Sequence, residues 1–187
     1  MSDWSKYIIN SNIDYNDYLE NGNTLLINCI RSKNQNKYSK LKFLIEKCNI
    51  DINKTDSSKY FLTPLSHCIQ INDYQAFCLL LHFGADYNKG SINETHINHL
   101  KHNNESNTPL MIACWHGRTK FIEKLCSYKD IGLNQQDGNG YTALMKCALK
   151  KHKKIYNYLL SFDRTDIYIR DRNNHTAEWI LNNKETG

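Results

Sequence analysis

The sequence predicts an all-α solenoid, in which short helix–turn–helix units stack on one another. Two observations lead to this prediction. A threonine-headed phrase recurs at residues 24, 63, 108, 142 and 176, with spacings of 39, 45, 34 and 34 residues. An apolar run follows each of the first four phrases, and a polar turn closes most units. Such a period is typical of repeat architectures, because one unit cannot bury its apolar face alone.

The recurring phrase has the features of a helix start. It reads GNTLLINCI from residue 22, FLTPLSHCI from 61, SNTPLMIAC from 106 and GYTALMKCA from 140, with a weaker copy, NHTAEWIL, from 174. The threonine hydroxyl can accept a hydrogen bond from a free N–H of the first turn, and proline suits the first helical position. Apolar residues such as Leu65, Cys68 and Ile69 then follow at helical spacing. Each phrase therefore predicts a short first helix.

The apolar runs LKFLIEKC, AFCLLLHF, FIEKLCSY and IYNYLLSF predict a longer second helix in each unit. Two stretches fall outside this pattern and are expected to be insertions. The first is KNQNKYSK, at 33–40, and the second is at 89–103, where a loop or short helix should project from the stack. The second insertion has no strong apolar period, so its removal should leave folding intact.

Residues 57–88, SSKYFLTPLSHCIQINDYQAFCLLLHFGADYN, resemble the ankyrin repeat nearly throughout. The resemblance covers essentially the whole chain and implies an ankyrin-repeat solenoid of about four full repeats, with β-turn or hairpin loops between units and partial caps at both ends. The expected organisation is one domain over 1–187, with an N-terminal cap at 1–20, repeats at 21–54, 57–88, 104–136 and 137–170, an inserted loop at 89–103, and a C-terminal cap at 171–187.

Cys114, Trp115 and His116 are adjacent and raise the question of a thiol enzyme. Neighbours on a helix point about 100° apart, so this cysteine and histidine cannot easily share a hydrogen bond. Cys29, Cys68 and Cys147 occupy the alanine place of the TPLxxA phrase, and Cys114 lies one residue later. Four small side chains at this place predict core cysteines. Trp115 and His116 lie at the helix end, where Trp115 either anchors a partner or folds over Phe121 or the inserted loop.

The resemblance implies that turns and first helices line a concave surface that binds another protein. Exposed aromatic and polar residues at the turn tips and first-helix ends are the candidates. The predicted partner-binding residues are Tyr60, Leu62, Glu105, Asn107, Trp115, His116, Asn139, Tyr141, Lys150 and Lys151. A monomer without cofactor, metal or small-molecule substrate is expected.

Two other functions stay open. A thiol-dependent enzyme would use Cys114 with a distant histidine. A basic surface, built on the lysine-rich segment 146–154, would bind nucleic acid or anionic lipid, although a solvated face is the simpler interpretation. The histidines His96, His99 and His102 could hold zinc, but their spacing lacks the i, i+4 pairing of a helical site.

Composition predicts the setting. Seven cysteines without paired spacing indicate free thiols, and no apolar run reaches the length of a membrane span, so a cytoplasmic protein is expected. The 24 Asn, 19 Ile and 19 Lys have A/T-rich codons. This bias fits an intracellular bacterium, a large DNA virus or a protist, and it makes an effector that acts on host proteins in the host cytoplasm a hypothesis.

Overall fold

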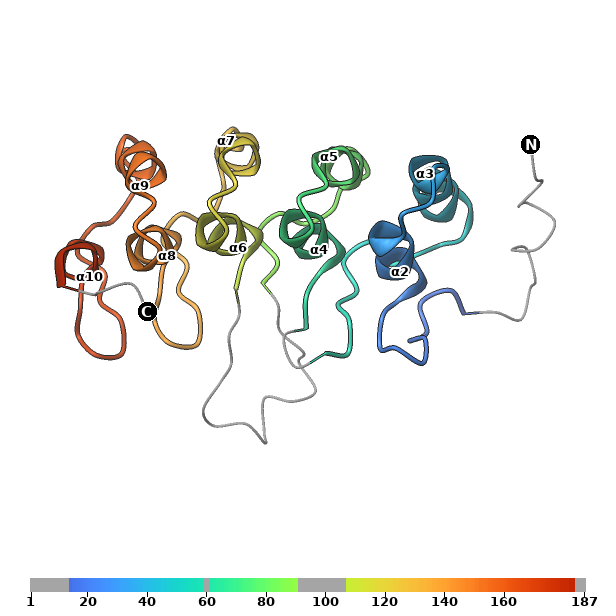
Figure 1. The fold of residues 1–187 in the computed structure, drawn as a ribbon, viewed down its shortest axis with the longest axis horizontal. Coiled ribbons are helices and arrows are strands. Elements are labelled where there is room, and N and C mark those ends of the chain that lie inside the picture. Colours follow the sequence, from blue (N-terminus) through green and yellow to red (C-terminus); the bar gives the residue numbers. More distant parts are fainter. Residues whose placement is uncertain (1–13, 59–60, 91–106, 184–187) are drawn as a thin grey trace.

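Two rows of helices form the molecule (Figure 1). The computed structural model describes residues 14–58, 61–90 and 107–183. The first helices of the units make one row: α2 (Leu25–Arg31), α4 (Pro64–Gln70), α6 (Pro109–Trp115), α8 (Ala143–Leu149) and α10 (Ala177–Asn183). The second helices make the other: α3 (Lys37–Lys47), α5 (Tyr74–His82), α7 (Thr119–Cys126) and α9 (Lys153–Leu160). The predicted all-α solenoid is confirmed.

Each first helix begins directly after its threonine, as predicted. The five threonine hydroxyls accept hydrogen bonds, 3.2–3.3 Å long, from the backbone N–H three residues later; these are Thr24, Thr63, Thr108, Thr142 and Thr176. Pro64 and Pro109 occupy the first turn, where a missing N–H costs no intrahelical hydrogen bond. Local capping chemistry therefore sets where the units start.

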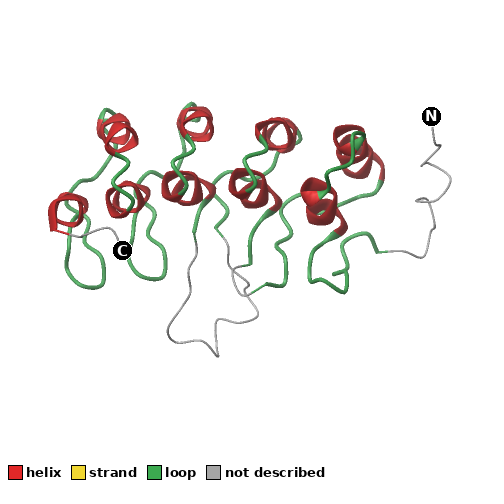
Figure 2. Cartoon of the chain, viewed as in Figure 1, coloured by secondary structure: helices red, strands yellow, loops and turns green. Residues whose placement is uncertain are grey.

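The loops that lead into the first helices project to one side of the stack (Figure 2). Two residues before the threonine, the backbone takes a positive φ of 46–81° at Gly22, Phe61, Gly140 and Asn174. A left-handed residue closes each of these turns, and glycine and asparagine adopt this conformation at least cost. The loops thus present their tips in a common register.

Asparagine side chains tie each unit to the next. The side-chain carbonyls of Asn16, Asn53, Asn88 and Asn134 accept hydrogen bonds of 2.7–2.9 Å from backbone N–H groups of the following unit. Asn16 belongs to the segment expected to form the N-terminal cap, and it makes the same bond as the three asparagines of the complete units. The same contact therefore repeats along the stack from Asn16 to Asp166.

The core lies between the two rows. Leu26, Leu65, Leu110 and Leu144, each two residues after its threonine, are buried, and so are Leu80 and Leu159 on the second helices. Each unit buries its apolar face only against its neighbours, as a solenoid requires.

The first expected insertion lies partly inside a helix, because α3 has 11 residues where the other second helices have eight or nine. Residues 37–40 were expected to belong to an insertion, but they form the first turn of α3, where Lys37 pairs with Asp73 at the start of α5, 2.6 Å away. The cap before residue 14 and residues 91–103 of the second insertion lie outside the described residues. Within the part of the chain that is described, no helix combines the length and the apolar character needed to cross a membrane.

Candidate partner-binding surface

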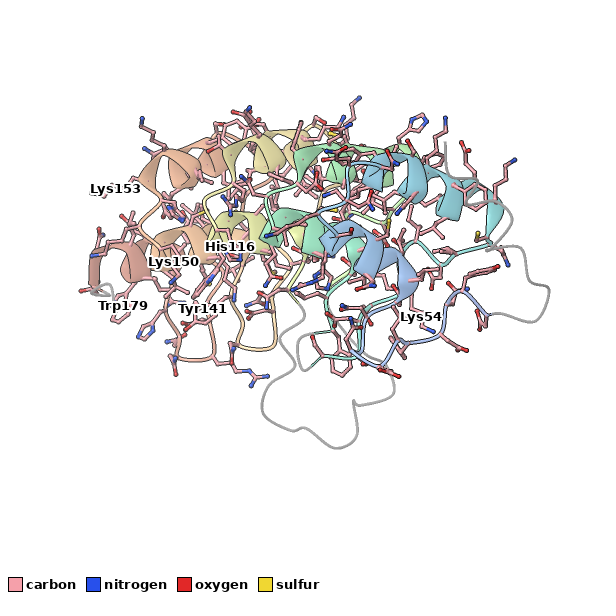
Figure 3. All side chains as sticks on the ribbon, turned by 45° about the vertical axis from the view of Figure 1, so that its right-hand side comes forward. Lys54, His116, Tyr141, Lys150, Lys153 and Trp179 are labelled. Carbon is pink, nitrogen blue, oxygen red and sulfur yellow. The ribbon has the colours of Figure 1, made fainter. Side chains whose placement is uncertain are left out.

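The loops and first helices share one side of the molecule. In Figure 3, His116, Lys150, Tyr141 and Trp179 lie along the row of first helices and their turns, whereas Lys153 lies at the start of α9 in the other row. Side chains from several units therefore face the same side, although they are far apart in sequence.

Among the described residues 107–183, Trp115 is the largest exposed side chain at the end of a first helix. Its residue is 40% exposed, and two lysines of the next first helix lie over its ring. Lys150 Nζ is 4.0 Å from the ring centroid and Lys146 Nζ is 5.6 Å from it. A cation above the face of an indole is attracted by the negative face of the ring. These contacts fix Trp115 at the surface.

Lys146 joins this aromatic contact to the turn before α8. Its ammonium lies 2.6 Å from Asp137 Oδ2 and 5.2 Å from the centroid of the Tyr141 ring. Both side chains of the ion pair are nearly inaccessible, at 9% for Lys146 and 0% for Asp137. The sequence interpretation placed Lys146 on a solvated lysine face. The structure shows that it is buried in an ion pair instead. The run 146–154 contains no acid, and Asp137 comes from the preceding turn.

We use the name Trp115 patch for Trp115, His116, Tyr141, Lys146 and Lys150. Asp137 neutralises Lys146, whereas among the described residues no carboxylate lies within ion-pair distance of exposed Lys150. The patch thus combines aromatic surface with one unneutralised ammonium group.

His116 ends α6 beside Trp115 and is exposed. Burial of part of its ring lowers the pKa of His116 below its usual value of 6.5, and the nearby Arg118 and Lys150 lower it further. At neutral pH its imidazole is therefore uncharged and can both donate and accept a hydrogen bond. The next residue, Gly117, has a φ of +65°, and a Cβ there would lie 2.9 Å from the His152 ring.

The other predicted partner-binding residues differ in their position and exposure. Leu62, Asn107 and Tyr141 occupy the position directly before the threonine in their units and are partly exposed. The carbonyls of Leu62 and Tyr141 accept the backbone N–H of the turn aspartate, at 3.0 and 2.9 Å. Asn139 is partly exposed at its turn, and Lys151 is exposed after α8 with a φ of +54°. Tyr60 and Glu105 lie outside the described residues.

A repeated aspartate that the sequence interpretation missed holds the turns. Asp56, Asp137 and Asp171 each accept backbone N–H groups of their own turn through Oδ1. The other oxygen faces a basic side chain: His67 at 2.8 Å, Lys146 at 2.6 Å and His175 at 3.7 Å. An aspartate five to seven residues before the phrase threonine is the signal that could have found these pairs.

A second surface tryptophan was also missed. Trp179 on α10 is exposed, and its ring stacks on that of His175 with centroids 3.5 Å apart and planes 3° from parallel. The weak fifth phrase, NHTAEWIL, contains both residues, but it was interpreted as a polar cap.

Cys114 has the properties of a core residue. It is fully buried, and burial raises the pKa of its thiol well above the usual range, with a further rise from the nearby Cys147 thiol. A thiolate nucleophile requires the opposite shift. Phe121, the predicted alternative neighbour of Trp115, makes its ring contacts with Tyr74 and Phe77 instead.

The described residues contain no group of three or more histidine, cysteine, aspartate or glutamate side chains that could hold a metal ion. His96, His99 and His102 lie outside them, so the structure does not bear on that hypothesis.

Comparison with known proteins identifies the repeat. Residues 89–173 match the family model described as ankyrin repeats (3 copies). The fold is similar to a chain in the solved structure of the predatory endopeptidase Bd0816 from Bdellovibrio bacteriovorus in complex with immunity protein Bd3460. The TM-score is 0.71 at 20% sequence identity, over 95% of this chain and 82% of that chain. At this identity the likeness shows a shared fold.

Proposed function

Because the chain is an ankyrin-repeat protein, we propose that it binds another protein through the side formed by its turns and first helices. The observation that carries the proposal is Trp115, a large aromatic side chain that is 40% exposed and contacted by two lysines of the next unit. Tryptophan, tyrosine and arginine are enriched among the residues that dominate interface energies. An exposed indole at the centre of a row of first helices fits such an anchor.

The further predicted residues extend the proposed surface along the stack. Leu62, Asn107, Asn139 and Tyr141 are partly exposed on turns, and Lys151 is exposed after α8. We include Tyr60 and Glu105 in the proposal on their place in the sequence alone. Such a surface spreads contacts over several units, as solenoids do when they bind extended partners.

The thiol chemistry supports a reducing compartment. All seven cysteines are free, and five of them are buried. We place the protein in a cytoplasm on this basis and propose that it acts there as a monomer. The role of an effector on host proteins stays a hypothesis that rests on codon composition.

Site-specific photo-crosslinking tests the proposed surface. His116 and Lys153 are replaced, one at a time, by p-benzoylphenylalanine, and each purified protein is irradiated in lysates of candidate host cells. Position 116 lies on the proposed surface and position 153 at the start of α9 in the other row, so the second variant is the matched control (Figure 3). We expect a discrete protein adduct from position 116 and none from position 153. Equal adducts from both positions, or adducts from position 153 alone, would contradict the proposal.

A further inference from the structure

Charge is distributed unevenly along the stack. The described residues 107–183 contain twelve lysine and arginine residues against seven aspartate and glutamate residues. Residues 14–58 and 61–90 together contain eight of each. Two of the seven acids, Asp137 and Asp171, have side chains without accessible surface and already face basic partners. Twelve basic and seven acidic residues give residues 107–183 a net charge of +5, and the buried Asp137–Lys146 pair does not change this value.

The Trp115 patch concentrates this charge next to an apolar surface. Lys146 is neutralised by Asp137, so it holds the Trp115 and Tyr141 rings without adding a net charge. Lys150 lies 4.0 Å above the Trp115 ring and has no carboxylate within ion-pair distance among the described residues. A lysine that is already held on an aromatic face loses less side-chain freedom when it binds an anion. Lys151, the next residue, is exposed as well.

We infer that the Trp115 patch, together with Lys151, binds a short acidic segment of the partner protein, an inference that rests on the proposed function. A carboxylate of the segment pairs with Lys150, and a neighbouring apolar side chain covers Trp115. Complementary charge of this kind raises the association rate and selects the partner.

A protein segment fits better than a long polyanion. At the other end of the row, Asp14, Asp17 and Glu20 are exposed on the first turn. A nucleic acid that followed the whole row would meet these carboxylates, whereas a folded or extended protein can place its acidic residues at α8 alone. Nucleic acid binding also scales with the number of neutralised phosphates. The Trp115 patch and Lys151 together offer two ammonium groups, those of Lys150 and Lys151, without a carboxylate at ion-pair distance in the described residues.

Fluorescence anisotropy with defined probes tests the inference. The probes are fluorescein-labelled octaglutamate and octaglutamine peptides, a labelled twenty-nucleotide single-stranded DNA, and phosphatidylserine vesicles in a separate flotation assay. The variants are Lys150→Gln, Trp115→Ala and, as the matched control, Lys153→Gln, which removes the same charge from the same unit at the start of α9. Melting curves establish that each variant is folded.

We expect octaglutamate to bind at low salt, to weaken as salt rises, and to bind more tightly than octaglutamine. Lys150→Gln and Trp115→Ala should each weaken its binding about threefold to tenfold, with melting temperatures close to that of the wild type, while Lys153→Gln should change binding by less than twofold. Stronger binding of DNA or vesicles than of octaglutamate would overturn the inference, as would an equal loss with Lys153→Gln. If octaglutamate fails to bind while position 116 still crosslinks a protein, the acidic segment is wrong and the proposed function stands.

Discussion

The α4–α5 and α8–α9 units each have an aspartate in the turn before the first helix, and it faces a different basic side chain in each unit. Asp56 and Asp137 both hold their turn through Oδ1 and face a basic side chain four residues after the phrase threonine. In the first unit that residue is His67, and the pair is sealed, with side-chain exposures of 3% and 4%. In the second it is Lys146, whose longer side chain also reaches the Trp115 and Tyr141 rings.

The comparison separates the contact that stabilises the turn from the side chains that the unit presents at the surface. Either basic side chain pairs with the buried carboxylate, although the turn after Asp56 is two residues longer than the turn after Asp137. Both basic side chains reach the end of the preceding first helix, where His67 Nδ1 lies 3.2 Å from the Arg31 guanidinium and Lys146 Nζ lies 5.6 Å from the Trp115 ring centroid. The residue at the end of the preceding first helix, Arg31 in one unit and Trp115 in the other, therefore decides whether this contact holds an aromatic side chain at the surface.

The largest expected effect is the same in both units. Leu80 and Leu159 lie on the second helices and are buried. Replacement of either by Ala should lower the free energy of unfolding by about 3 kcal/mol, because the truncation leaves a cavity that a packed core fills only in part. Urea denaturation of the two variants measures this. An unchanged midpoint in both variants would contradict the assignment of these helices to the core.

A smaller effect on stability is expected from the buried Asp56–His67 pair, and this effect should depend on pH. Burial alone would raise the pKa of Asp56, but the hydrogen bonds from His67 and Ser58 outweigh it, so the pKa lies below its usual value of 3.8. The ionised carboxylate therefore stabilises the fold at neutral pH, and this contribution is lost as the pH falls below about 4.

Asp56→Asn should cost about 2 kcal/mol at pH 7, and the difference from the wild type should shrink at pH 3. Urea denaturation at both pH values measures it, with Asp163→Asn, at an exposed carboxylate, as the control. A cost that is the same at pH 3 and pH 7 would show that the charge of Asp56 does not matter.

Local chemistry explains which features could be predicted. The starts of the first helices depend on a threonine and its next three residues, and the burial of Cys68, Cys114 and Cys147 follows from helical spacing, so both were accessible from the sequence. Cys29, which was predicted to be a core residue as well, is only half-buried. The Asp137–Lys146 pair was missed, because the aspartate that recurs before the phrase threonine had to be linked to a turn between residues 137 and 141 that folds back on α8. The start of α3 was missed for a related reason, since Lys37 is held by Asp73 from the next unit.

The smallest expected effect concerns Cys114. Cys114→Ser should lower the free energy of unfolding by about 1 kcal/mol, because a fully buried hydroxyl needs a hydrogen-bond partner that the thiol did not. Partner binding should stay unchanged, since the side chain does not reach the surface. Thiol labelling of the folded wild type gives an independent measurement. Rapid labelling of Cys114 would contradict its burial and revive the thiol-dependent enzyme.

The central claim is that the first-helix side of the C-terminal half binds a protein partner. The most direct measurement is the affinity of the crosslinked partner, once purified, for the wild type, Trp115→Ala and Cys114→Ser. Truncation of a true anchor costs about 2 kcal/mol or more, so Trp115→Ala should weaken binding roughly thirtyfold while Cys114→Ser leaves it unchanged. Full affinity in Trp115→Ala, combined with loss of function in Cys114→Ser, would contradict the account.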